Sequence, residues 1–472
     1  MLKILVARDS LFKIKSILAL PNSSTLNSKL FNSKLFNFYS VITYHRFVLD
    51  NGLRVLVHED PSTPMAAVNV LYNVGSRDEH PAKTGFAHLF EHLMFGGSAN
   101  IPDFDDPLQL AGGDNNAFTN NDFTNFYEVL PAQNLEVAFW LESDRMLSLN
   151  FDPQVLEVQR KVVVEEFKET CLNQPYGDMW HHLSEMAYQT HPYRWPVIGQ
   201  VPEHVESATM DDVQDFYFKH YRPNNAVLAV CGNVKLSQVK RLAKKWFADI
   251  PAGDIPERSI AREAPQLSLQ QKIQETNVPV DALYIAFHCC DRTHPDFYLT
   301  DLLSDVLSNG PSSRLYRRLL KEKQLFTQID AYITGTLDPG LFIIEGRPSE
   351  GVTLEAAEAA VWEELQLLLD EPIGEEELQK CKNRAESALI FSELSALGKA
   401  MNLAFFELLG DADLINREPD LYAQITAEDM HRVAKTLFRE ENCSKLYYKA
   451  IPGAAAMAGF SGGMDDDDDD DY

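Results

Sequence analysis

Three polar residues lie close together inside an otherwise apolar stretch, GFAHLFEHLMFGG, at residues 85–97. They are His88, Glu91 and His92. On a helix, residues at i, i+3 and i+4 share one face, so both imidazoles and the carboxylate would point the same way. Zinc accepts imidazole nitrogen and carboxylate oxygen in a tetrahedral arrangement. The spacing therefore offers at least two ligands to one metal ion.

A purely structural role for these residues is the alternative, because single histidines on apolar faces usually make hydrogen bonds within a core. Two histidines and a glutamate on one buried face are harder to satisfy without a cation, since burying an unpaired carboxylate costs several kcal/mol. We therefore favour metal binding. The order H-x-x-E-H is the inverzincin motif, in which a glutamate beside the metal-bound water acts as base. Glu91 then suits the base better than it suits the third protein ligand.

The segments around the motif predict an α+β domain. Asn51-Gly52 tolerates the positive φ of a tight turn and predicts a hairpin over 47–60. Thr209 and Asp212 form a capping box that opens a helix. Further strands are expected at 65–74, 115–131 and 226–234, and further helices at 85–97, 133–148 and 153–172.

The chain starts again after a segment rich in proline and charge. TMDDVQDFYFKHYRPNN at 209–225 matches TAEDMHRVAKTLFREEN at 426–442, an offset of 217 residues. The sequence therefore predicts two homologous α+β domains, each a largely antiparallel sheet packed with helices. We expect the domains at 45–250 and 273–452, with a linker at 251–272. The second should contain strands at 278–289 and 327–347, helices at 295–309 and 311–322, two long helices and a last strand.

The same offset predicts that the second domain is free of metal. It carries His88 to Asp305, Glu91 to Ser308 and His92 to Asn309. One zinc ion per chain is therefore expected.

Composition excludes several classes of protein. A formal net charge of −28 argues against nucleic acid, which requires a basic face. No run of about 20 apolar residues is present, so no membrane-spanning helix is expected. The six cysteines have no C-x-x-C spacing and suit a reducing compartment. Residues 453–472 contain a run of aspartates and should form a solvated, disordered tail.

The first 44 residues differ from the rest of the chain. They are rich in lysine, serine and asparagine and contain the tandem NSKLF at 27–36. This segment is either a disordered extension or a targeting peptide. We predict a cytoplasmic protein, with the mitochondrial matrix or the periplasm as alternatives if the segment is a targeting peptide.

Three motifs in order resemble one known family. They are TGFAHLFEHLMFGG at 84–97, GGDNNAFTNNDFTNFYEVLP at 112–131 and RKVVVEEFKE at 160–169. Together they are similar to the pitrilysin and insulinase family of zinc metallopeptidases, which includes the mitochondrial processing peptidases. The resemblance covers roughly residues 45–450. It implies a zinc endopeptidase in which Glu91 takes a proton from water and passes it to the leaving amine.

The resemblance also suggests the third metal ligand. In this family it is a glutamate on a later helix, and the matching register places it at Glu166. The adjacent Glu165 is the alternative, although it should face another way on a helix. The family usually has a supporting glutamate seven residues before the ligand, where this chain has Gln159. An amide can still make hydrogen bonds beside a metal ligand but carries no charge.

Residues Asn116, Ala117, Phe118 and Thr119 resemble the family's edge strand beside the zinc. A free strand edge can pair with an extended peptide through its backbone. Backbone pairing depends little on sequence, so the expected substrates are unfolded peptides or short polypeptides held inside a chamber.

Two departures from the family pattern bear on partners. Active members often carry an arginine and a tyrosine seven residues apart in the second domain, and this chain has Leu320 and Thr327 there. In this family, two units of this size close a chamber. We therefore predict a dimer, which is either a homodimer or a heterodimer with a metal-free homologous subunit that supplies the missing groups. The alternative function is a non-catalytic structural or partner subunit of a peptidase-like complex. An unrelated metal-binding helical protein would not explain the 217-residue repeat.

Overall fold

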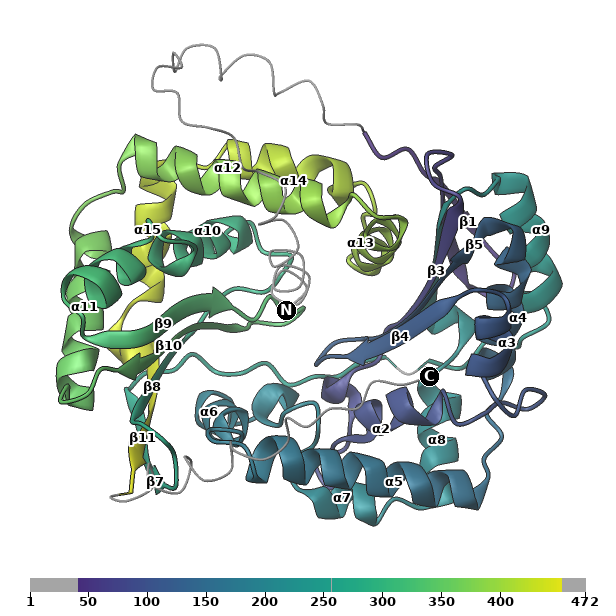
Figure 1. The fold of residues 1–472 in the computed structure, drawn as a ribbon, viewed down its shortest axis with the longest axis horizontal. Coiled ribbons are helices and arrows are strands. Elements are labelled where there is room, and N and C mark those ends of the chain that lie inside the picture. Colours follow the sequence, from purple (N-terminus) through teal and green to yellow (C-terminus); the bar gives the residue numbers. More distant parts are fainter. Residues whose placement is uncertain (1–40, 256, 452–472) are drawn as a thin grey trace, which may run out of the picture.

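The computed structural model describes residues 41–255 and 257–451, which form two sheets with helices packed on both (Figure 1). The first sheet has the strand order β1-β2-β6-β3-β5-β4, with β2 and β6 parallel and the other neighbours antiparallel. Its strands are β1 (His45–Val48), β2 (Arg54–Glu59), β3 (Met65–Tyr72), β4 (Asp114–Thr119), β5 (Thr124–Pro131) and β6 (Ala226–Gly232). The edge strand β4 is the element that matters most for the site.

The second sheet repeats this plan without a counterpart of β1. Its order is β7-β11-β8-β10-β9, and only β7 and β11 are parallel. The strands are β7 (Gln270–Thr276), β8 (Ala282–His288), β9 (Phe326–Ile333), β10 (Leu341–Pro348) and β11 (Cys443–Ala450). Each sheet therefore contains one parallel pair within an antiparallel sheet, which confirms the α+β class and the duplication.

Helices follow the same repeat. A shift of 217 residues carries α8 (Met210–His220) onto α15 (Ala427–Leu437), residue for residue. Both helices begin at a threonine whose hydroxyl accepts a hydrogen bond from the amide three residues later. The other α-helices of the first half are α2 (Phe86–Leu93), α3 (Asp105–Leu110), α4 (Leu135–Leu147), α5 (Pro153–Phe167), α6 (Met179–Ala187), α7 (Pro202–Glu206) and α9 (Leu236–Phe247). Those of the second half are α10 (Phe297–Ser308), α11 (Leu354–Asp370), α12 (Glu375–Ser392), α13 (Ala396–Leu408) and α14 (Leu414–Ala423).

The two halves exchange one helix each. Helix α13 packs on β3 and β6 of the first sheet, and α6 packs on β7, β8 and β11 of the second (Figure 1). The buried contacts include Leu403 of α13 against the first sheet and Leu183 of α6 against the second. The 217-residue shift carries Met179, the first residue of α6, onto Ala396, the first residue of α13. The exchange is thus a property of the duplicated unit.

Several expectations need correction. Strand β7 begins at Gln270, inside the predicted linker 251–272. The single strand expected over 327–347 is the hairpin β9–β10, and the region expected to hold two long helices holds α11 to α15.

The chain ends need the same comparison. The predicted extension 1–44 overlaps the described residues at its end, where Ile42 is buried between the two halves. Its first 40 residues, and the predicted tail 453–472, lie outside the described residues. All six cysteines fall within the described part and are free.

No single helix in residues 41–255 and 257–451 has the length and apolar composition to cross a bilayer. Taken together, α12 and α13 do reach that composition, but they meet at an angle of 108°.

Candidate metal centre

Helix α2 carries His88, Glu91 and His92 and consists of only eight residues. Gly85 precedes it with φ of +88°, a conformation that other residues adopt only with strain. A Cβ at Gly85 would lie 2.8 Å from the Ile198 carbonyl oxygen. The buried face of α2 includes Phe86, Leu89, Phe90 and Leu93. The remaining face, with all three polar side chains, is turned towards α5 and β4, on which α2 packs.

The structure brings His88, His92 and Glu166 together at one point. The Nε2 atoms of His88 and His92 are 3.3 Å apart. Glu166 Oε2 lies 3.6 Å from Nε2 of His88 and 3.4 Å from Nε2 of His92. Two ligands bonded to zinc at about 2.0–2.1 Å with tetrahedral angles lie about 3.3 Å apart. The three atoms therefore form one face of a tetrahedron of the size that zinc requires, and the donor set fits that ion.

Glu166 reaches this point from α5, a helix that Asp152 caps by accepting a hydrogen bond from the amide of Gln154. Val163 and Phe167 are buried on the inner side of α5. A rotation of the helix about its axis would expose them, so their burial holds the orientation of α5. The neighbouring Glu165 lies on the outside, 71% exposed, and pairs with Lys168 at 2.7 Å. The geometry therefore favours Glu166 over Glu165 as the third ligand.

The surroundings of His88 and Glu166 favour the unprotonated forms that bind a cation. Desolvation lowers the pKa of His88 to about 4, so its imidazole is neutral near pH 7. The hydrogen bond with His92 lowers the pKa of Glu166 and keeps its carboxylate ionised. Ligand atoms must be unprotonated to bind metal. Nδ1 of His88 is buried without a hydrogen-bond partner among the described residues, so Nε2 is the nitrogen available to the site.

Glu91 lies beside the three candidate ligands, but its carboxylate is not part of the group of potential ligand atoms. Burial raises the pKa of its carboxyl, while contact with Thr119 acts in the opposite direction. A carboxyl with a raised pKa is a better proton carrier near neutral pH. Thr119 is the last residue of β4, so the edge strand ends against the proposed base.

The predicted substrate-binding residues all lie on β4, whose only partner among the described strands is β5. Side chains alternate along it. Ala117 packs towards the core beneath α2, and Phe118 packs towards α13 on the opposite face. The far edge of β4 has no strand partner among the described residues, and the amides of Asn115 and Ala117 donate to the side chains of Asp114 and Asn116. Pairing of an extended chain with this edge stays a prediction. Asn116 is exposed at this edge.

Comparison with known proteins agrees with this arrangement. Residues 54–200 match the family described as insulinase, peptidase family M16, and residues 207–385 match the family described as peptidase M16 inactive domain. The chain belongs to the M16 peptidase family. The M16 assignment confirms the resemblance that the three sequence motifs indicated.

Individual M16 relatives extend over most of the chain. The zinc protease PqqE of Helicobacter pylori is 28% identical over 407 residues, which are 85% of this chain and 91% of that protein. The beta subunit of the mitochondrial-processing peptidase of Saccharomyces cerevisiae is 24% identical, over 73% of this chain and 77% of the subunit. The crystal structure of a protease from Helicobacter pylori has a TM-score of 0.81 at 27% identity, covering 86% of this chain and 99% of that one.

The second M16 domain has no such cluster of side chains. At the positions that correspond to His88 and His92, the amide of Asn309 donates to the carboxylate of Asp305 at 2.5 Å. The hydroxyl of Ser308, at the position of Glu91, donates to Asp330. Among the described residues, the group in the first domain is the one set of metal-binding side chains that converges on a point. The second domain therefore shares the fold, but its described residues include no cluster of metal-binding side chains.

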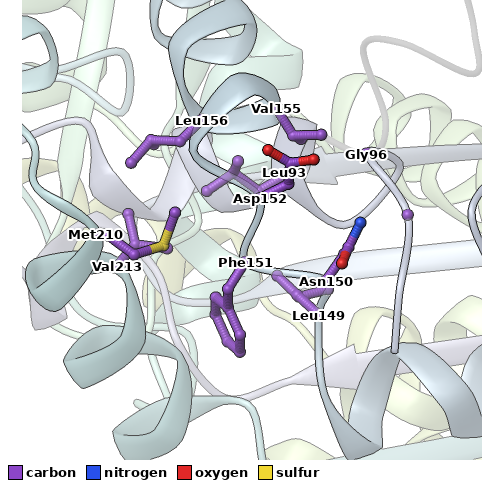
Figure 2. Close-up of a pocket in the computed structure, with 11 residues that line it drawn as sticks. Leu93, Gly96, Leu149, Asn150, Phe151, Asp152, Val155, Leu156, Met210 and Val213 are labelled. Atoms are coloured by element: carbon purple, nitrogen blue, oxygen red, sulfur yellow. The ribbon is translucent and has the colours of Figure 1, made fainter. Parts of the chain in front are cut away.

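Gln159 lies two turns before Glu166 on α5, at the edge of an opening lined by Gly96, Val155 and Val158. It makes no hydrogen bond within the described part of the chain. Its proposed support of the metal ligands therefore stays a prediction. Beside this opening is a small pocket of about 20 Å³, lined by residues of α5 and α8 and of the segments that follow α2 and α4, with room for a single water (Figure 2). None of the candidate ligands lines it, so it is separate from the candidate site.

Leu320 and Thr327, the two departures from the family pattern, offer no cation or phenol in the structure. Leu320 packs against the second core. The hydroxyl of Thr327 donates to the carbonyl of Arg347 in its own sheet. Any arginine or tyrosine that steadies a substrate must come from elsewhere.

One buried residue that contacts α2 has no signal in the sequence. Glu79 lies before the helix and accepts hydrogen bonds from the amides of Gly85 and Ala87. A glutamate six residues before a glycine has no recognised capping signature, so only the structure reveals it.

Proposed function

We propose that this chain is a zinc-dependent endopeptidase that cleaves unfolded peptides or short polypeptides. The observation that carries the proposal is the triangle formed by His88, His92 and Glu166, with sides of 3.3, 3.4 and 3.6 Å. These side chains would hold one zinc ion. When bound, zinc supplies Lewis acidity towards a carbonyl oxygen and lowers the pKa of water. Relatives named zinc proteases support this choice of metal.

Glu91 is the proton carrier in this proposal. Its carboxylate accepts a proton from the attacking water and then gives that proton to the leaving amine nitrogen. The raised pKa that burial produces suits both steps, because the group must hold the proton and then release it. Thr119, the last residue of β4, lies close enough to act on the pKa of Glu91, so the carboxyl is near the end of the strand.

Strand β4 would hold the substrate. An extended peptide that pairs with the free edge beyond Asn116–Thr119 would lie along the strand that ends at Glu91. A folded protein has few strands free to pair in this way. We therefore expect cleavage of unfolded chains and little cleavage of the same proteins when folded.

We further propose that the active form is a dimer whose partner is a metal-free homologous subunit. Leu320 and Thr327 support this idea, because neither offers the charged or phenolic group expected at those positions. If the proposal is wrong and the chain is a non-catalytic subunit, it should lack stoichiometric zinc and peptidase activity even with a partner present.

The test combines metal analysis with peptide cleavage. We expect about one zinc per chain, and cleavage of an unfolded polypeptide that a chelator abolishes and added zinc restores. His92→Ala should lose the metal and the activity together, because two remaining ligands bind zinc weakly. A full-length chain that folds but holds no zinc, in the presence and absence of a homologous partner, would refute the proposal.

A further inference from the structure

Glu79 occupies a position that the proposed reaction does not use. Its side chain is only 6% exposed. One carboxylate oxygen accepts from the amide of Gly85 at 3.0 Å, and the other accepts from the amide of Ala87 at 2.8 Å. Trp195, itself buried, contacts the same carboxylate and donates its indole N–H to the carbonyl of Ser76. The buried side chain of Glu79 therefore caps the N-terminus of α2.

The first amides of a helix have no partner within the helix. Gly85 cannot supply one, because it has no side chain. Helix α2 is also only two turns long, and a helix of that length depends on tertiary contacts for its stability and direction. His88 follows Ala87 directly. Fixing the Ala87 amide therefore fixes the first turn, from which the imidazole of His88 projects.

The contact with the two amides does not depend on the charge of Glu79. Burial raises the pKa of its carboxyl to about 8, and the two amides act against that rise. A carboxyl group keeps acceptor capacity in both protonation states, so its oxygens can accept from the amides of Gly85 and Ala87 in either state.

The second domain provides an internal comparison. The 217-residue shift carries Glu79 onto Asp296, which precedes α10. Asp296 makes no side-chain capping bond there, and it pairs with Arg432 of α15 at 2.7 Å. An acid is thus present at both positions. Only in the domain with the candidate ligands is this acid buried, with hydrogen bonds to amides at the start of a helix.

We propose that Glu79 is a positioning residue for the metal site, holding the first turn of α2 so that His88 meets His92 and Glu166. The inference rests on the proposed function, since it concerns the affinity of the same site. It goes beyond that function by assigning a role to a residue that touches neither the metal ligands nor the substrate strand.

The test compares Glu79→Gln with Thr209→Ala in the full-length chain. The first variant keeps the shape of the side chain but replaces one acceptor oxygen by an NH₂ group, which cannot accept from a backbone amide. The second removes the cap of α8, where the Thr209 hydroxyl accepts from the Asp212 amide, and leaves the hydrogen bonds of Glu79 to the Gly85 and Ala87 amides in place. Zinc affinity is measured by competition with a chelator, and the site geometry by the absorption spectrum of bound Co²⁺.

We expect Glu79→Gln to weaken zinc binding by about 10- to 100-fold and to shift the Co²⁺ spectrum, as loss of partners behind metal ligands does. Thr209→Ala should lower the unfolding temperature without changing zinc affinity or the spectrum. Equal zinc affinity in Glu79→Gln and the unaltered protein would overturn the inference. If the unaltered protein bound no zinc, the proposed function itself would fail.

Hydrogen exchange of the unaltered protein tests the contact if Glu79→Gln does not fold. The amides of Gly85 and Ala87 should exchange more slowly than that of Phe86, which lies between them and which Glu79 does not contact. Uniform exchange across the three amides would overturn the role of Glu79.

Discussion

The two domains share a fold and differ in chemistry. Both sheets place a parallel pair at one side and a free edge strand at the other, β4 in the first domain and β9 in the second. The first domain directs His88 and His92 at Glu166, whereas Asp305 and Asn309 of the second bond to each other. The second domain has the same sheet plan with a polar pair in place of the ligands. The fold therefore does not require the candidate ligands at these positions.

The exchanged helices explain why both domains are nevertheless present. Helix α13 covers the first sheet and α6 covers the second, so neither sheet is covered by its own half alone. Ion pairs cross the same boundary, including Arg77 with Asp338 and Lys399 with Asp60. The second domain thus contributes the helix that covers the apolar face of the sheet carrying β4.

The largest expected difference between the domains is in catalysis. Glu91→Gln should lower the turnover number by about 10³-fold while zinc stays bound, because the amide cannot carry the proton. Ser308→Ala at the corresponding position of the second domain should leave turnover unchanged. Steady-state cleavage of an unfolded polypeptide and zinc analysis of both variants provide the check. Equal losses in the two variants would contradict the division of roles between the domains.

A smaller effect tests the exchange of helices. Leu183 of α6 and Leu403 of α13 are fully buried, each against the sheet of the other half. Truncation of either to alanine should lower the free energy of unfolding by about 3 kcal/mol, as cavities in packed cores do. Leu394→Ala, at a position 67% exposed, should change it by less than about 0.5 kcal/mol.

Denaturant unfolding followed by fluorescence and circular dichroism distinguishes two kinds of outcome. If the exchange couples the halves, each leucine variant should still unfold in one transition that both probes report at the same midpoint. Two separate transitions in Leu403→Ala would show that the domains are independent despite the exchange.

The sequence was sufficient where a pattern encodes a local geometry. The spacing of His88, Glu91 and His92 on one helix face, and the capping box at Thr209, both depend on a single turn of helix. Glu166 is different, because its meeting with the histidines depends on how α5 packs on α2. The family register indicated it, and the geometry agrees.

Other features depend on contacts that no local pattern encodes. Met179, Leu183 and Ala187 recur every four residues and reveal a buried face on α6, but not which sheet covers it. Strand β7 was missed because its sequence, QQKIQET, is polar and only alternate residues are partly buried at the sheet edge. Glu79 could not be found because its partners are backbone amides across a loop.

The smallest expected effect concerns the corner between α12 and α13. Burial, with Glu418 nearby, raises the pKa of Glu393 to about 7. The corresponding residue of the first half is Tyr176, which binds the carbonyl of Val280 and carries no charge near neutral pH. An acid whose pKa is raised on folding keeps its proton in the folded state where the unfolded chain has lost it. Its contribution to stability is therefore lost as pH rises from about 4.5 to about 7.

Replacing Glu393 by Gln should remove this dependence. Above pH 7 the variant should be more stable than the unaltered protein by about 1 kcal/mol, a value that allows for solvent screening of a partly exposed group. Near pH 4.5 the two should be nearly equal, because the carboxyl is then protonated in the folded protein. Free energies of unfolding at a series of pH values give the difference directly. A difference independent of pH would show that Glu393 ionises normally, and would remove this contrast between the two corners.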